Sequence, residues 1–332
     1  ESVEALLSQP GLATPVLALN DLPAAYVAPP GLAGRMTGMS LSQAAEVAAI
    51  ARHAVASAYR RAIVVAPESD WGERMAAAFQ NEFLQEDQEI LAATRYLESE
   101  NDHSAVLERL LLIDESKARA QRLENVLQVP LEFEPTRRTD VDVIFMAANP
   151  TEAKLIRPQL RFLDAGDVPV YAPGRIYSGQ PDPARNQDLD GIRFPLTPWE
   201  LSHSSEDEIP QLASLRKGSL ASLFALGQDD WNILTWLDLM RKDPDFSFTG
   251  QSGQYRMNAD GSLERQPAWG VFNQGRPVPL AAPPQARGGL PPLRQPRELS
   301  RAGRSVLRPR PSPGPDRRGT PDRGGRESPP RA

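Results

Sequence analysis

Cysteine is absent from this sequence of 332 residues. Its absence excludes disulfide bonds and thiolate-bound metals but leaves the compartment open, because a periplasmic protein can fold without disulfides. No stretch of about 18 apolar residues is present either, so no segment is expected to span a membrane. The first residue is Glu1 rather than Met. We therefore expect a processed or excised piece of a longer protein, with any targeting signal or lipid-bearing cysteine upstream.

The motifs of common enzyme families are also missing. The chain has no GxSxG nucleophile elbow, no zinc-binding HExxH and no glycine-rich nucleotide loop. Its histidines, His53, His103 and His203, lack metal-ligand partners at helical spacing, which predicts surface residues and no metal site. Acidic pairs such as Asp229 and Asp230 are expected on solvated faces. These absences favour a binding protein without cofactor over an enzyme.

One segment imitates the start of a calcium-binding loop. Asn186, Asp188 and Asp190 alternate before Gly191, as the ligands and the sharp turn of such a loop require. The twelfth position, which should carry a bidentate Glu, is Thr197. We therefore expect a polar turn that leads into a strand, and no calcium.

Composition and charge describe a globular body with an unusual end. A hydrophobic content of 40% supports a sizeable core, and the length fits about two domains. From Ala281 onward there are 12 Arg and no Lys against 4 acidic residues, whereas the body carries 25 basic and 39 acidic residues. An acidic body argues against a nucleic-acid-binding surface.

Residues 281–332 are dominated by Pro, Gly and Arg, which predicts a disordered tail that cannot bury enough apolar surface to fold. One interpretation is a basic tail that binds an anionic partner. The other, which we favour, is a shift of reading frame near Ala281, because a GC-rich gene translated out of frame yields this mixture. Resequencing the gene through residues 279–286 distinguishes the two.

Strand and helix patterns alternate from Pro15 to Leu196, which predicts a mostly parallel sheet covered by helices. The polar run at residues 258–261 predicts the turn of a later hairpin. The predicted strands are residues 15–20, 62–66, 89–96, 141–147, 168–172 and 191–196. The predicted helices are residues 40–59, 71–84, 103–113, 115–126, 151–165 and 219–241.

The candidate binding residues follow the carboxyl ends of the strands, where ligands bind in open sheets of this kind. The stretch from Pro169 to Leu201 is the most informative, because its polar loop has a specific composition but no chemistry-bearing pair. Ser69 or Asp70 could instead cap the following helix, and capping does not exclude a place at a cleft. The candidate ligand- or partner-binding residues are Ser69, Asp70, Trp71, Asn149, Arg175 and Tyr177.

Two of these loop segments carry a family resemblance. AIVVAPESDWGERMAAAF and VDVIFMAANPTEAKLIRPQLRFLDAGDVPVYAPGRIYSGQPDPARNQDLDGIRFPLTPWEL resemble the C-terminal domain of the LppC/LpoA lipoproteins, the penicillin-binding protein activators of Gram-negative bacteria. The similarity covers residues 3–280, and PAWGVFNQGRPVPL at its end resembles the usual end of the family's domain.

The resemblance implies an α/β, two-lobed type I periplasmic-binding-protein-like fold, with parallel sheets flanked by helices and a first lobe incomplete at its N-terminus. On that pattern, residues 1–40 are a remnant of the first lobe and residues 41–190 form the second. Residues 191–280 return to the first lobe with a closing helix and a hairpin. Residues 281–332 are the tail.

The resemblance also implies a non-enzymatic regulator without cofactors. It would bind and activate a class A penicillin-binding protein, promote peptidoglycan synthesis, and contact peptidoglycan in addition. The full-length protein would be periplasmic and held at the inner face of the outer membrane by an upstream lipid anchor. Two alternatives stay open: a solute receptor with a small polar ligand between the lobes, and an enzyme, for which no nucleophile–base pair can be assembled.

Overall fold

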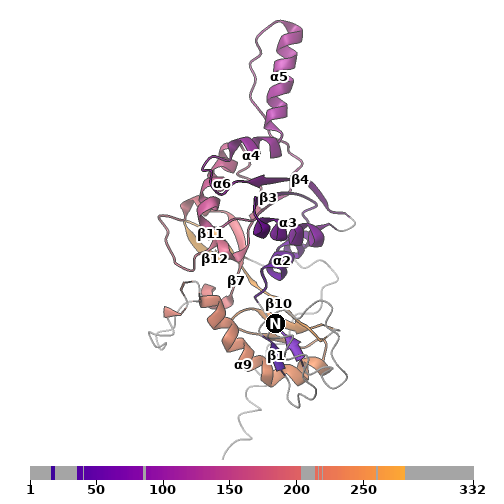
Figure 1. The fold of residues 1–332 in the computed structure, drawn as a ribbon, viewed down its shortest axis with the longest axis vertical. Helices are drawn as coiled ribbons and strands as arrows, with labels where there is room; N and C mark the ends of the chain where they lie inside the picture. Colours follow the sequence, from indigo (N-terminus) through magenta and orange to yellow (C-terminus); the bar gives the residue numbers. More distant parts are fainter. Residues whose placement is uncertain are drawn as a thin grey trace, which may run out of the picture. The chain divides into compact units, whose positions relative to one another are not determined.

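A computed structural model describes residues 16–18, 36–39, 41–84, 87–202, 214–215, 217–218, 220–258 and 261–280. All of them belong to one compact unit, residues 1–289. The predictions for the tail, for the reading frame and for His203 fall outside the described residues. Within the described part, the chain forms a large and a small α/β lobe (Figure 1).

The large lobe is built on a seven-stranded sheet in the order β12-β11-β7-β6-β5-β3-β4. Strands β4, β3, β5, β6 and β7 run parallel to their neighbours, and β11 and β12 extend the sheet by antiparallel pairing. The inner strand β3 is buried from its second residue onward, as expected for a parallel strand covered on both faces. The strands are β3 (Arg61–Pro67), β4 (Glu89–Tyr96), β5 (Val143–Met146), β6 (Val170–Tyr171), β7 (Ile192–Leu196), β11 (Ala268–Asn273) and β12 (Arg276–Pro279).

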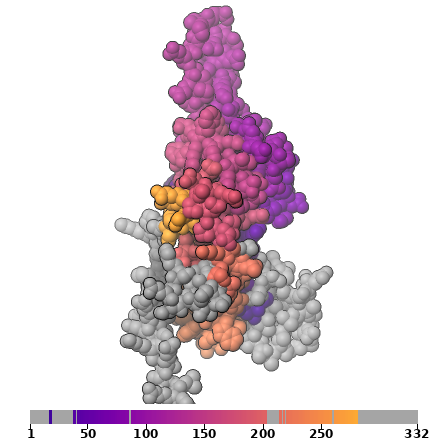
Figure 2. All heavy atoms as spheres, turned by 90° about the vertical axis from the view of Figure 1, so that its left-hand side faces the viewer, coloured from indigo at the N-terminus to yellow at the C-terminus, as the bar shows by residue number. Residues whose placement is uncertain are grey.

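Helices cover both faces of this sheet. On one face, α2 (Gln43–Ala56) and α3 (Asp70–Phe83) pack their apolar residues against β3, β5 and β6. On the other, α4 (Ser104–Leu110) and α6 (Pro150–Phe162) complete a second core. Helix α5 (Ile113–Leu127) instead extends away from the lobe as an arm (Figures 1 and 2).

The small lobe contains a parallel pair, β1 (Val16–Ala18) with β2 (Met36–Gly38), and an antiparallel sheet in the order β10-β9-β8. Helix α9 (Ala221–Lys242) packs Ile233, Leu237 and Met240 into the core of this lobe, which also contains Tyr255. The sheet strands are β8 (Ser247–Thr249), β9 (Gln254–Met257) and β10 (Leu263–Gln266).

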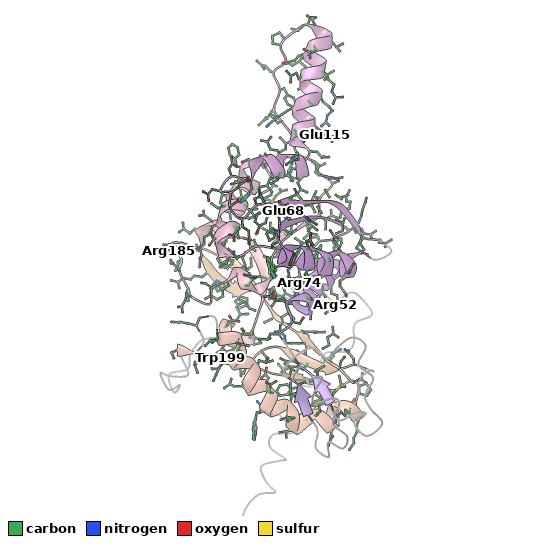
Figure 3. All side chains as sticks on the ribbon, viewed as in Figure 1. Arg52, Glu68, Arg74, Glu115, Arg185 and Trp199 are labelled. Atoms are coloured by element: carbon green, nitrogen blue, oxygen red, sulfur yellow. The ribbon has the colours of Figure 1, made fainter. Side chains whose placement is uncertain are left out.

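The backbone passes between the lobes at three places. The first crossing joins β2 to α2, the second leaves β7 through α7 (Pro198–Leu201) towards α9, and the third joins β10 to β11 at Pro267. Trp199 lies in the second crossing, where its backbone N–H donates to the Gln251 carbonyl of the small lobe at 2.9 Å (Figure 3). The salt bridge from Arg52 on α2 to Glu264 on β10, at 3.2 Å, also joins the lobes.

The prediction for residues 191–280 needs correction. Strand β7 and the β11–β12 hairpin belong to the large sheet, since Gly270 is paired with Phe194 and Val271 with Arg193. Only the segment between them, with α9 and the three-stranded sheet, lies in the small lobe. The chain therefore leaves the large sheet only after Leu196, at the end of β7.

The prediction of solvated positions was wrong for three polar residues. His53 is 8% exposed and packs on Trp269 with a ring separation of 3.9 Å, and His103 is 2% exposed and packs against Tyr96. Asp229 is fully buried. His53 and Asp229 have their partners, Trp269 and the amides of Gln251 and Ser252, on other elements, which the local pattern does not contain.

Candidate functional site

A cavity of about 550 Å³ opens where the three crossings meet. Each crossing contributes to its wall, with Leu41 from the first, Thr197 from the second and Pro267 from the third. The large lobe adds the N-terminal end of α6 and the loop after β6, which contains the short helix η1 (Gly174–Ile176). The cavity therefore lies at the carboxyl ends of parallel strands, as expected for an open α/β sheet. Its polar side chains belong to Gln43, Glu46, Asn149, Arg175, Tyr177, Ser178, Thr197, Glu200, Ser222 and Arg265.

The rim is formed by two predicted residues that contact each other. The Arg175 guanidinium lies over the Trp71 ring, 4.4 Å from its centroid. Trp71 in turn donates from Nε1 to Oε1 of Gln43 at 2.8 Å. This chain of contacts joins the η1 loop to the first turns of α3 and α2, so an exposed cation and an aromatic ring are held together at the cavity mouth.

Tyr177 and Asn149 stand on the wall. The Tyr177 ring packs against Phe194 and Phe272, and burial raises the pKa of its hydroxyl to about 12, which keeps it neutral. Asn149 accepts a hydrogen bond at Oδ1 from the Thr151 amide, at 2.9 Å, and so caps α6.

Ser69 and Asp70 stand apart from the cavity wall. Ser69 accepts a hydrogen bond at Oγ from the Gly72 amide at 3.2 Å, which confirms the predicted cap of α3. Asp70 is the exposed first residue of that helix. Of the six predicted residues, the structure thus brings Asn149, Arg175 and Tyr177 to the cavity and sets Trp71 against Arg175.

Sequence reasoning missed the charged groups inside the cavity. Glu46, in the first turn of α2, accepts from the Gly174 amide at 2.7 Å. Glu200 closes a capping box on α7, accepting from the Thr197 hydroxyl at 2.8 Å. Burial raises the pKa of both carboxyl groups, and nearby Arg265 opposes that rise. The Thr197-x-x-Glu200 spacing is a readable capping signal, but no local pattern marks Glu46 or Arg265.

The polar groups of the cavity are of the kinds that form hydrogen bonds and ion pairs with polar or charged partners. The cavity offers carboxylates, amides, hydroxyls and guanidinium groups, with no histidine and no cysteine on its wall. Among the described residues, no group of three or more His, Asp and Glu side chains could hold a metal ion. No helix in the described ranges is long and apolar enough to cross a membrane.

Two α/β lobes joined by three crossings around such a cavity define the fold of the type I periplasmic binding proteins, which confirms the predicted fold class. Solved structures agree. A protein from Chromobacterium violaceum named for a branched-chain amino acid ABC transporter has a TM-score of 0.55 at 20% identity, over 79% of this chain and 74% of that one.

The chain belongs to the LppC family: the family model described as "LppC putative lipoprotein" matches residues 1–275. Its relatives include the penicillin-binding protein activator LpoA of Vibrio antiquarius, 28% identical over 236 residues, and that of Vibrio vulnificus, 25% identical. Each alignment covers 70% of this chain but 38% of the relative, so the chain spans about two-fifths of their length.

The fold also matches LpoA of Haemophilus influenzae. The full-length protein aligns with a TM-score of 0.60 at 20% identity, over 84% of this chain and 46% of that one. Its C-domain, described as a regulator of PBP1A, aligns with a TM-score of 0.60 at 19% identity, over 84% and 79% of the two chains. These likenesses establish the architecture of the chain.

Proposed function

We propose that this chain is the synthase-binding part of a penicillin-binding protein activator. It binds a class A penicillin-binding protein and stimulates peptidoglycan synthesis without catalysing a reaction itself. The observation that carries the proposal is membership of the LppC family together with relatives named as activators. The recognition chemistry of the cavity agrees with it.

The activator would work from the periplasm, tethered to the inner face of the outer membrane through a lipid anchor elsewhere in the full-length protein. If the activator binds a more active conformation of the synthase more tightly than a less active one, it shifts the synthase population towards the more active conformation. This difference in affinity is all that stimulation requires. Peptidoglycan itself is a further candidate contact.

For the contact with the synthase we propose the cleft rim. Trp71 and Arg175 form a stacked aromatic–cation pair, and these two residue types dominate the energetics of protein interfaces. Asn149 and Tyr177 continue this surface inward, while Ser69 and Asp70 present the start of α3 beside it. The rim is held by hydrogen bonds and ring contacts, so little ordering entropy is lost on docking.

The test measures binding of the purified chain to class A penicillin-binding proteins, followed by glycan polymerisation and crosslinking with and without it. We expect binding and faster synthesis, and about tenfold weaker binding for Arg175→Ala and Trp71→Ala. Arg185→Ala is the matched control. It lies in the same long loop, at the side of the large lobe in Figure 3, forms a salt bridge with Asp182 at 3.6 Å, and does not line the cavity.

Two results would count against the proposal at different levels. No binding to any class A synthase would remove the activator function from this chain. Binding that survives both rim substitutions would keep the function and move the contact surface elsewhere.

A further inference from the structure

Helix α9 lies at the edge of the small lobe and carries an apolar stripe along its exposed side (Figure 1). Trp231 is 78% exposed, and the leucines of the stripe are about half exposed or more. At 3.6 residues per turn, the members of the stripe lie within about 80° of one another around the helix, on the side away from the buried Asp229 and Ile233. The α9 stripe consists of Leu220, Leu223, Gly227, Trp231 and Leu234.

The exposed side of α9 also lacks charge along the stripe. From Leu220 to Leu234 the charged residues are Asp229, which is fully buried, and Asp230, which is half-buried. The chain as a whole contains 24% charged residues, so a solvated helix of this length would carry several. The cores of protein interfaces are depleted in charge and enriched in tryptophan. The α9 stripe therefore has the composition of an interface rather than of a solvated helix face.

Gly227 lies in the middle of the stripe, and the packing of its own lobe does not require a glycine there. A Cβ atom added at this position would meet nothing within 4 Å. Glycine destabilises the interior of a helix relative to alanine, so its presence has a cost that no contact within the chain offsets. The distance between two packed helices depends on the side chains at their contact, and a glycine at that point lets a second helix approach closely.

The stripe is complementary to itself. Its members recur every three or four residues, which is the spacing of a seam between two helices. If two copies of α9 pack antiparallel with Gly227 on the two-fold axis, Leu220 lies opposite Leu234 of the second copy, and Leu223 lies opposite Trp231. Each tryptophan then meets a smaller leucine instead of another tryptophan. A two-fold interface requires this kind of self-matching surface.

We propose that the α9 stripe is a contact between two copies of this chain, formed by antiparallel packing of α9 about Gly227. The exposed tryptophan and leucines offer about 400 Å² of apolar surface per copy, roughly half of what each partner contributes to a standard interface. We therefore expect a weak dimer, with a Kd of about 10–100 µM. The proposal goes beyond synthase binding, because the stripe lies on the small lobe and the proposed docking rim on the large lobe.

Sedimentation equilibrium of the 332-residue chain, over concentrations from about 1 µM to 1 mM, measures the self-association. We expect monomers at the low end and dimers at the high end. Trp231→Ala should raise the dimer Kd by about tenfold or more, because a tryptophan in the middle of an interface is among the most costly residues to truncate. Phe162→Ala is the matched control, since this aromatic residue is 89% exposed but lies on α6 of the large lobe. It should leave the dimer Kd unchanged.

Two substitutions of Gly227 separate dimerisation from folding. Gly227→Arg places the new side chain in open space and replaces a weak helix former, so the Tm of the dilute monomer should not fall, whereas two like charges at the axis should abolish the dimer. Gly227→Cys tests the axis directly, because the chain has no other cysteine and any disulfide must join two copies. Helix axes about 8–10 Å apart place the two Cα atoms within disulfide range. Gln121→Cys, exposed on α5, is the control and should crosslink far more slowly.

Three results would overturn the proposal. The first is a chain that stays monomeric up to about 1 mM, or a dimer that persists in both Trp231→Ala and Gly227→Arg. The second is a longer form of the protein that stays monomeric with Trp231 shielded from acrylamide, which would assign the stripe to its own chain. The third is loss of synthase binding in Trp231→Ala while the unsubstituted chain is monomeric, which would assign the stripe to the synthase. The rim variants Arg175→Ala and Trp71→Ala should leave sedimentation unchanged, so failure of the activator proposal is a separate result.

Discussion

Replacing Asp229 with Ala is expected to destabilise the small lobe. Asp229 is fully buried on α9, and its carboxylate accepts hydrogen bonds from the Gln251 amide at 2.7 Å and the Ser252 amide at 2.6 Å. The Ser252 hydroxyl donates to the same carboxylate. This one side chain therefore holds the loop between β8 and β9 against the helix.

The expected cost follows from the donors left behind. Ser252 is fully buried, so its amide would lose its acceptor without access to water, whereas Gln251 is exposed and its amide can be hydrated. A buried donor without a partner costs about 1–3 kcal/mol, and hydrogen bonds to a charged acceptor lie at the upper end. The variant also no longer bears the free-energy cost of burying the Asp229 carboxylate, and this offsets part of the loss of the hydrogen bonds. We expect the free energy of unfolding to fall by about 3 kcal/mol.

Urea unfolding followed by tryptophan fluorescence measures this loss, since Trp231 and Trp236 lie on the same helix. Hydrogen exchange of residues 250–255 reports the loop directly. Asp229→Asn is expected to cost about 2 kcal/mol, because its amide nitrogen would face a donor in either orientation. Asp238→Ala is the control: this aspartate is 81% exposed and 3.7 Å from Arg241, so we expect a change within about 0.5 kcal/mol.

Gly250 provides an independent check of the same contact. A Cβ atom at this position would collide with the Asp229 carboxyl group. Gly250→Ala is therefore destabilising alone but nearly neutral in the Asp229→Ala background, a strong coupling between the two sites. A loss below about 1 kcal/mol for Asp229→Ala, or additive effects of the two substitutions, would refute the reasoning.

Three further changes test other features. Burial, and then the charge of Asp229, raise the pKa of Asp230 from 3.8 to about 6, so its contribution to stability is present below pH 3.8 and is lost as pH rises through 6. Asp230→Asn should therefore stabilise the chain at pH 7 by about 1 kcal/mol after solvent screening, and leave its stability unchanged at pH 3.5, in parallel urea titrations. Burial, and then the charge of Arg193, lower the pKa of His53 from 6.5 to about 4, so its contribution to stability is present above pH 6.5 and is lost towards pH 4. An NMR titration in which this imidazole protonated near pH 6.5 would contradict its buried position. Gly72→Ala should lower the urea midpoint by more than an exposed Ala substitution on α3, because the new Cβ would collide with the Pro67 carbonyl.

The elements that the sequence predicted well are those whose signal is local. Residues 62–66 are a continuous apolar run, and residues 141–147 are apolar except for Asp142; they contain the inner strands β3 and β5, which are buried on two faces. The turn at residues 258–261 contains Gly261 at a φ of +84°, which the polar Asn-Ala-Asp-Gly run favours. The hairpin β9–β10 and helix α9 were confirmed for the same reason.

The pairing of β11 with β7 could not be predicted in this way. Strand β11 is only half-buried over most of its length, so it lacks the apolar run of a central strand. Its partner lies about 75 residues earlier in the chain, beyond the whole small lobe. Which lobe a strand joins depends on the tertiary structure. Here it depends on the edge of the large sheet that β7 leaves unpaired and that β11 then occupies.

The candidate site likewise contains residues that the sequence predicted and residues that it did not. The rule that ligands sit beyond parallel strands led to Asn149, Arg175 and Tyr177, which reach the cavity from the ends of two strands. Glu46, Glu200 and Arg265 come from beside the three crossings, and they meet only because the lobes fold together. Buried Asp229 was missed for a similar reason, since its partners lie on another element.

The charged groups of the cavity lie beside the three crossings, where the two lobes are joined. Glu46 follows the first crossing on α2, Glu200 lies in the second, and Arg265 precedes the third. The Trp71–Arg175 rim is connected to α2 through Gln43, three residues before Glu46. The interior of the cavity and the proposed docking rim therefore share one structural element, the first turn of α2. A group that bound inside the cavity and changed the affinity for the synthase would have its own affinity changed by the same factor.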